Sequence, residues 1–185
     1  MDDKAIVELY FARSEKAISE TAVKYGGYCY SIANNILSNK EDSEESVNDT
    51  YLAAWNTMPP KHPSILSAFL GKITRNISLD RWKSRSAYKR GGSEVTLALD
   101  ELSECISNGE STEQVAEKRE LLRCINWFLD ELPETERNMF VCRYWYLEPV
   151  QQIADRYGFS LSKTASMLRR TREKLRKQLI KEGLQ

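Results

Sequence analysis

The chain has 185 residues, of which 41% are hydrophobic and 29% are charged, and its formal net charge is zero. This length fits one ordinary domain or two small ones, and this composition excludes a disordered chain. No stretch approaches the ~20 apolar residues of a membrane-spanning helix, and residues 1–18 are too charged for a signal peptide. We therefore expect a cytoplasmic protein without membrane insertion.

The first half of the chain is expected to be helical, because 8 glycines and 5 prolines are few for a hairpin-rich protein. Apolar residues recur at helical spacing over residues 3–18 and again over residues 28–37. The Gly26-Gly27 pair between these segments predicts a break in the helix.

Two further helices are predicted before residue 92. The first begins at Asn39, where acidic residues complement the helix dipole, and ends at Pro59-Pro60. The second opens at Pro63 and continues into a basic stretch near residue 88. Its apolar face is expected to consist of residues spaced four apart, namely Ile65, Phe69, Ile73 and Ile77.

An acidic linker is predicted over residues 93–112, which have weak periodicity and an Asn108-Gly109 turn signal. Helical patterns return from residue 113, and no segment predicts a strand. The expected fold is all-α, with small helical domains at residues 1–92 and 113–185.

The chain contains four charged blocks of alternating sign, although its net charge is zero. Residues 41–50 contain five acids and no base, and residues 62–91 contain seven bases and one acid. Residues 93–120 contain eight acids and two bases, and residues 161–185 contain eight bases and two acids. Each basic block is a candidate phosphate-binding surface, although either alone is also typical of a solvated helix face.

Metal binding and cofactor chemistry are not predicted. The four cysteines, Cys29, Cys105, Cys124 and Cys142, form no CxxC pair, and His62 has no partner at ligand spacing. Buried free thiols are the better interpretation. The sequence also lacks phosphate-binding glycine motifs and a nucleophile–histidine pair, so we expect neither a cofactor nor an enzyme.

A helix-turn-helix is predicted over residues 149–179. Pro149 suits the first position of a helix, Gly158 suits a turn with positive φ, and Ser160 suits the N-cap of the next helix. Ala154 is small enough for the second helix to cross closely. An ordinary helical hairpin with a basic surface is the alternative, but this combination favours DNA binding.

The second helix of this motif is expected to bury Thr164, Leu168, Thr171 and Leu175. Its opposite face would meet the major groove, where arginine pairs bidentately with guanine. Candidate contacts on that face are Ser162, Lys163, Ser166, Met167, Arg169 and Arg170. Candidate phosphate contacts further along are Arg172, Lys174, Arg176 and Lys177.

The wider chain resembles the sigma-70 family in the two-domain arrangement of its extracytoplasmic-function group. Residues 42–55 resemble region 2.2, an acidic helix with a Thr-aromatic pair and a tryptophan. The resemblance implies that this helix docks on the β′ subunit of core RNA polymerase, and an acidic face suits a basic partner. The docking residues it implies are Asp42, Glu45, Asp49 and Trp55.

Residues 68–82 resemble regions 2.3 and 2.4, which read and melt the −10 promoter element in the family. Opened strands need a basic groove with ring faces for extruded bases. The residues implied in this contact are Arg75, Asn76, Asp80, Arg81, Trp82, Lys83 and Arg85. Trp82 is equally compatible with a core position, and Asn76 with Asp80 could serve only local geometry.

Residues 132–144 resemble region 4.1, which leads into the helix-turn-helix as region 4.2. The resemblance implies contact with the β subunit of the polymerase and with the −35 element, with Ala165, Ser166, Arg169 and Arg170 at base-reading positions. The family often has Val-Lys-Ser-Arg where this chain has Thr164-Ala165-Ser166-Met167, so two usual basic contacts are missing. Lys163, Arg169 and Arg170 could compensate.

The resemblance implies a promoter-specific initiation factor that binds core RNA polymerase and promoter DNA. It further implies an anti-sigma factor as a partner, and we expect a monomer when the protein is free. The acidic linker could run toward the RNA exit path and mimic nucleic acid. A dimeric helix-turn-helix regulator is the main alternative, and an enzyme acting on nucleic acid is the other.

Overall fold

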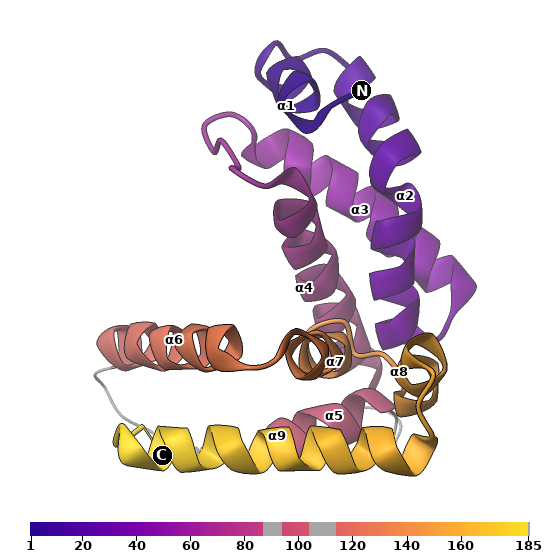
Figure 1. The fold of residues 1–185 in the computed structure, drawn as a ribbon. Helices are drawn as coiled ribbons and strands as arrows, with labels where there is room; N and C mark the ends of the chain where they lie inside the picture. Colours follow the sequence, from indigo (N-terminus) through magenta and orange to yellow (C-terminus); the bar gives the residue numbers. More distant parts are fainter. Residues whose placement is uncertain (87–93, 104–113, 185) are drawn as a thin grey trace. The chain divides into compact units, whose positions relative to one another are not determined.

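A computed structural model describes residues 1–86, 94–103 and 114–184, and their regular secondary structure is helical throughout (Figure 1). This confirms the expected all-α class. Contacts between Cα atoms divide the chain into two compact units, Met1–Gly91 and Gly92–Gln185. No helix in the described ranges is both long and apolar enough to cross a membrane.

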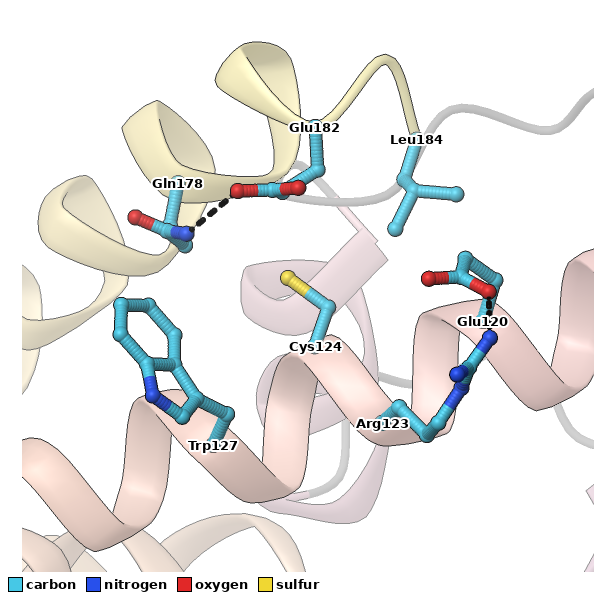
Figure 2. A pocket seen from close by; sticks show the side chains of 7 residues that line it. All are labelled: Glu120, Arg123, Cys124, Trp127, Gln178, Glu182 and Leu184. Atoms are coloured by element: carbon cyan, nitrogen blue, oxygen red, sulfur yellow. Dashed lines mark hydrogen bonds and ion pairs between the residues drawn. The ribbon is translucent and has the colours of Figure 1, made fainter.

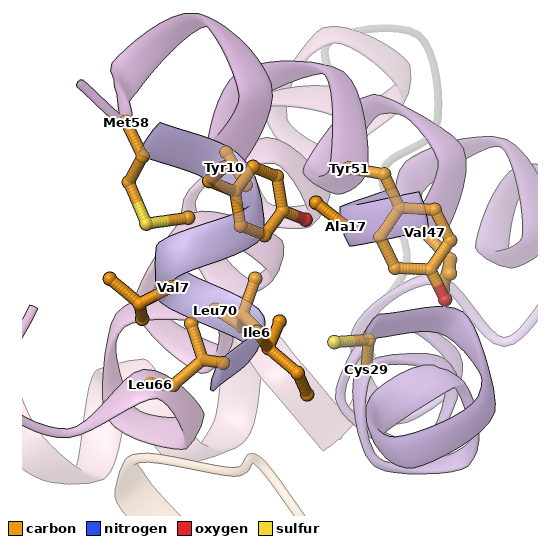
Figure 3. Packing of buried hydrophobic residues seen from close by; sticks show 11 residues of the cluster. Ile6, Val7, Tyr10, Ala17, Cys29, Val47, Tyr51, Met58, Leu66 and Leu70 are labelled. Carbon is orange, nitrogen blue, oxygen red and sulfur yellow. The ribbon is translucent and has the colours of Figure 1, made fainter. Parts of the chain in front are cut away.

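The first unit contains α1 (Asp3–Phe11), α2 (Lys16–Leu37), α3 (Lys40–Thr57) and α4 (Leu66–Ser86). Helices α2, α3 and α4 pack against one another in all three pairs, and α1 packs against α2. Figure 3 shows the apolar core that they enclose. Its buried members are Ile6, Val7, Tyr10, Ala17, Cys29, Val47, Tyr51, Ala54, Met58, Leu66 and Leu70.

The expected helix over residues 3–18 is two helices. Helix α1 ends at Phe11, and Arg13 adopts a left-handed conformation with φ 52° before α2 begins at Lys16. The break lets Tyr10 of α1 and Ala17 of α2 both reach the core on different helix axes. The apolar residues of this segment are spaced as on one straight helix, but they reach the core from two helices.

The expected break at Gly26-Gly27 is wrong, because α2 continues through both glycines. A glycine inside a helix costs about 1 kcal/mol relative to alanine. Packing against α3 and α4 offsets that cost, and Gly26 lies where a Cβ would come within 3.2 Å of the Tyr51 hydroxyl. The tertiary contacts of α2 therefore decide its length.

The buried face of α4 lies one residue away from the expected one. Ile65 is 60% exposed, whereas the buried stripe is Leu66, Leu70, Thr74 and Ser78. Helix α3 meets this stripe with buried hydroxyl residues of its own, and the Thr50 hydroxyl donates to the Thr74 hydroxyl over 3.0 Å. Small hydroxyl side chains let the two helices approach closely, which an apolar pattern does not signal.

The second unit contains α5 (Glu94–Ser103), α6 (Gln114–Glu131), α7 (Glu134–Tyr144), α8 (Val150–Tyr157) and α9 (Leu161–Lys181). Helix α9 packs against α6, α7 and α8, and α5 packs against α7. The core residues of this unit include Phe128, Leu132, Met139, Phe140, Leu147, Ile153, Leu168, Leu175 and Leu179.

Helix α5 lies within the segment predicted as an acidic linker. Val95 and Ala98 are buried on it, while Leu97 is half exposed. Residues 104–113, which contain Cys105 and the Asn108-Gly109 signal, lie outside the described residues. The linker bounds of 93 and 112 stay a prediction.

Candidate functional site

The helix-turn-helix forms where the sequence predicts it. Gly158 ends α8 in the left-handed region with φ 64°, and the Phe159 amide donates to the Ala154 carbonyl over 3.0 Å. This is the pattern of a Schellman cap, which satisfies the last carbonyls of a helix. The Ser160 side chain then caps α9 by accepting from the Lys163 amide at 3.2 Å. The turn is thus held by a glycine and a serine.

The buried stripe of α9 confirms the predicted one. Its members are Thr164, Leu168, Thr171, Leu175 and, one turn further, Leu179. The opposite face turns to solvent and is basic. Of the expected contacts on it, Ser162, Lys163, Ala165, Arg169 and Arg170 are exposed, and Ser166 and Met167 are half-buried.

The two arginines on this face are held by local contacts. Arg169 forms an ion pair with Glu173 over 3.1 Å, one helical turn away. The Arg170 side chain donates to the Ser166 carbonyl over 3.3 Å. Near the start of α9, the Lys163 ammonium lies 3.6 Å from the centre of the Phe159 ring. A row of cationic groups with defined positions results.

Arg172 differs from the other expected DNA contacts. Its side chain is only 16% exposed, and its guanidinium donates to Glu101 of α5 over 3.1 Å and to the Tyr144 hydroxyl over 2.7 Å. The structure therefore does not bring Arg172 to the exposed face. Sequence reasoning missed this contact because Glu101 lies in the segment predicted as a linker.

The acidic and basic blocks of the first unit meet along the rim between α3 and α4. Arg81 of α4 pairs with Asp49 over 2.6 Å and also with Glu45. One turn further, Arg85 pairs with Asp42. Hydrogen bonding to Glu45 raises the pKa of Arg81, so its positive charge is reinforced. Residues expected to bind DNA are thus paired with residues expected to bind polymerase.

The other residues expected at the −10 element are spread around α4. Arg75 is half-buried, and this burial lowers the pKa of its guanidinium. Trp82 is also half-buried, whereas Asn76, Asp80 and Lys83 are exposed. The candidate ring of Tyr88 and the cations Lys89 and Arg90 lie outside the described residues.

Trp55 packs at the edge of the first unit's core. The Arg13 guanidinium lies 5.2 Å from the centre of its ring, and the Arg13 side chain donates to the Trp55 carbonyl over 2.7 Å. The outward face of α3 instead presents Leu52, which is 58% exposed. Sequence reasoning missed Leu52, although its spacing of four from Asn48 and eight from Glu44 places it on that face.

A pocket lies between α6 and the end of α9, apart from the residues discussed above (Figure 2). Trp127 and Cys124 of α6 face it, with Gln178, Glu182 and Leu184 opposite. Burial raises the pKa of the Cys124 thiol, which reduces its reactivity. Within the described ranges, no group of three His, Cys, Asp or Glu side chains could hold a metal ion.

Comparison with protein families links both units to one family. A family model described as Sigma-70 region 2 matches residues 22–88, and one described as Sigma-70, region 4 matches residues 128–177. Together the two models match more than half of the chain. The first begins within α2 and includes α3 and α4, and the second includes α7, α8 and most of α9. No curated protein matches the chain.

Proposed function

The chain belongs to the sigma-70 family, and on that premise we propose which of its surfaces carry out the work of a sigma factor. Region 2 and region 4 in a chain of 185 residues fit the extracytoplasmic-function type. Such a protein is not itself catalytic. It binds core RNA polymerase and promoter DNA and directs promoter recognition and transcription initiation.

We assign −35 recognition to the solvent-facing side of α9. The observation that carries this assignment is the capped helix-turn-helix, which presents a basic face opposite a buried stripe of leucines and threonines. The N-terminal residues of a recognition helix contact base edges, and residues further along contact phosphates. The assigned residues are Ser162, Lys163, Ala165, Ser166, Met167, Arg169 and Arg170.

We assign −10 recognition to α4 and to the chain that follows it. Exposed Lys83 and the arginines Arg81 and Arg85 supply positive charge beside half-buried Trp82. Single strands bind to surfaces that combine cations with ring faces. Arg75, Asn76 and Asp80 complete the proposed set, of which Arg75 is half-buried.

We assign polymerase docking to the outward face of α3. Asp42, Glu45 and Asp49 lie at the edge of this face toward α4, where they form ion pairs with Arg81 and Arg85. Exposed Leu52 offers apolar contact on the same face, and Trp55 lies half-buried nearby. An acidic face with an apolar centre is suited to a basic partner surface.

We further propose that the protein is cytoplasmic, that it is a monomer when free, and that an anti-sigma factor binds it. The support for both the partner and the monomeric state is the resemblance to the sigma-70 family. Gel filtration of the purified chain should give one peak at the mass of a single copy. A dimer would favour the rival reading, a helix-turn-helix regulator that binds palindromic sites.

The decisive test adds the purified protein to bacterial core RNA polymerase and maps RNA 5′ ends on DNA from the source organism. The expected result is a set of discrete starts preceded by a shared two-part motif. A variant with Arg169→Ala and Arg170→Ala should lose these starts while still binding core. Absence of both start-site selection and core binding at low salt would contradict the proposal.

A further inference from the structure

Helix α5 is docked on the helix-turn-helix unit by a small apolar face and one carboxylate. Val95 and Ala98 are buried, with exposures of 2% and 1%. The Glu101 carboxylate accepts a hydrogen bond from the Tyr144 hydroxyl over 2.9 Å and one from Arg172 over 3.1 Å. Helix α5 packs against α7, and its Glu101 also reaches Arg172 of α9.

The same carboxylate also lies beside a buried cation. The Nε atom of Arg143 is 3.5 Å from Glu101, and the Arg143 side chain has no exposed surface. The Tyr144 hydroxyl links the group by accepting from Arg172 over 2.7 Å while it donates to Glu101. Two arginines and a phenol from α7 and α9 thus converge on one acid of α5.

Arg172 lies at the edge of the face of α9 that we assign to DNA. It follows Ala165 by seven residues, which is two helical turns, so the two positions lie almost in line along the axis. Arg169 is one turn before it and is 65% exposed. An arginine at the border of a basic face can turn toward solvent, where a DNA phosphate would meet it.

We propose that α5 is an intramolecular inhibitor of DNA binding, in which the Glu101 carboxylate occupies Arg172 in place of a DNA phosphate. This inference rests on the proposed DNA-binding role of α9. DNA and α5 then compete for the same guanidinium. Binding of DNA at full strength requires that Glu101 release Arg172.

The docking of α5 is weak enough to be reversed. A ten-residue helix is marginal by itself in water, and only two of its apolar side chains are buried. Leu99 and Leu102 are half-buried, and Leu97 is half exposed. A phosphate carries the same sign of charge as Glu101 and can replace it at Arg172.

The test compares two variants that remove the same charge from neighbouring positions of α5. Glu101→Gln removes the negative charge that holds Arg172 but keeps an oxygen that can accept from the Tyr144 hydroxyl. Asp100→Asn is the matched control, because Asp100 is exposed. The measurement is the affinity of the full chain for a short duplex of random sequence, over a range of salt concentrations.

Glu101→Gln should bind the duplex more tightly than the unaltered chain, and the slope of log affinity against log salt should steepen by about 0.9, as one extra phosphate contact requires. Asp100→Asn should leave the slope unchanged. In a chain with Arg172→Ala, Glu101→Gln should no longer have an effect. Equal slopes for the two α5 variants, or an effect that persists without Arg172, would overturn the proposal.

Hydrogen exchange provides a second measurement on the unaltered chain, should Glu101→Gln fail to fold. Saturating duplex should raise the exchange rate of the amides of α5, and unchanged rates would overturn the inhibitor role. Transcription with core polymerase separates the two ideas. If starts are selected normally but Glu101 has no influence on DNA affinity, only the inhibitor role fails, whereas loss of DNA and core binding together rejects the sigma assignment.

Discussion

The Arg81 guanidinium lies 2.6 Å from the Asp49 carboxylate, so a residue assigned to DNA is paired with one assigned to polymerase. Asp49 is 44% exposed and Arg81 is 22% exposed, which places the pair at the surface of the first unit. The pair therefore connects the two proposed binding surfaces, and both of its side chains stay partly exposed to solvent.

A double-mutant cycle measures this connection. Arg81→Ala, Asp49→Ala and the double variant should give a coupling free energy of about 0.2–1 kcal/mol, because water screens exposed ion pairs. The measurement is urea unfolding at low and high salt, and the coupling should shrink at high salt. Strict additivity at both salt concentrations would show that the pair does not form in solution.

Gly71 and Gly27 offer a matched test of helix packing. A Cβ at Gly71 would overlap the Tyr28 side chain, whose ring carbon Cζ would lie only 3.1 Å away. Gly71→Ala should lower the unfolding free energy by about 1–3 kcal/mol, the usual cost of overpacking. Gly27→Ala meets nothing within 4 Å and should raise it by about 0.5–1 kcal/mol. Urea unfolding of both variants checks the signs.

Removing the obstructing hydroxyl supplies the control for that test. Tyr28→Phe, combined with Gly71→Ala, should recover part of the lost stability. If Gly71→Ala is as stable as Gly27→Ala, α2 and α4 do not approach as closely as the structure shows.

The turn between α8 and α9 depends on the left-handed conformation of Gly158. Gly158→Ala should cost about 1–2 kcal/mol, since a side chain is strained in that region. Gly158→Asn should cost less, because asparagine tolerates it. The transition of the second unit can be followed through the fluorescence of Trp127 and Trp145. Equal losses for the two variants would argue against a left-handed residue here.

Arg170 is exposed on α9 and tests base reading. Arg170→Ala should weaken binding to a cognate promoter duplex by about 1–3 kcal/mol and relax the preference at one base pair. The control is Lys181→Ala at the C-terminal end of α9. Competition binding against a library of duplexes checks this. A uniform loss for all sequences would make Arg170 a phosphate contact instead.

Asp3 should make stability depend on pH in acid. The Lys24 ammonium donates to its carboxylate over 2.6 Å and, with Tyr25, holds the pKa of Asp3 below its usual value. A carboxylate with a lowered folded-state pKa stabilises the protein above the unfolded-state pKa of about 4 and loses that contribution as pH falls. The difference in unfolding free energy between the unaltered chain and Asp3→Asn should therefore diminish below about pH 4. A difference that stays constant through that range would contradict the pairing.

Local signals in the sequence were sufficient for the helix-turn-helix. Gly158, Ser160 and the stripe of Thr164 and Leu168 act within a few residues of one another, so their pattern is legible without knowledge of the fold. The same holds for the start of α3, where the Asn39 side chain accepts from the Asp42 amide over 2.9 Å. Caps and turns depend on interactions between residues a few positions apart, so the local sequence indicates them.

Features that depend on contacts between distant segments could not be predicted from the local sequence. Helix α2 passes through Gly26-Gly27 because α3 and α4 pack against it, and the face of α4 shifts because Thr74 meets Thr50 across 24 positions of sequence. The spacing of apolar residues does not predict that packing will tolerate glycines inside a helix. It also does not predict that small hydroxyl side chains will be buried where two helices cross closely.

The sequence by itself therefore determined the helical class, the four alternating blocks of charge, and the motif that places the chain in its family. Only the tertiary structure decided that Arg81 and Arg85 face Asp49 and Asp42, and that Glu101 of α5 holds Arg172. The reason is the range of the interactions. Helix signals act over one or two turns, whereas an ion pair depends on where two separate helices bring their side chains in space.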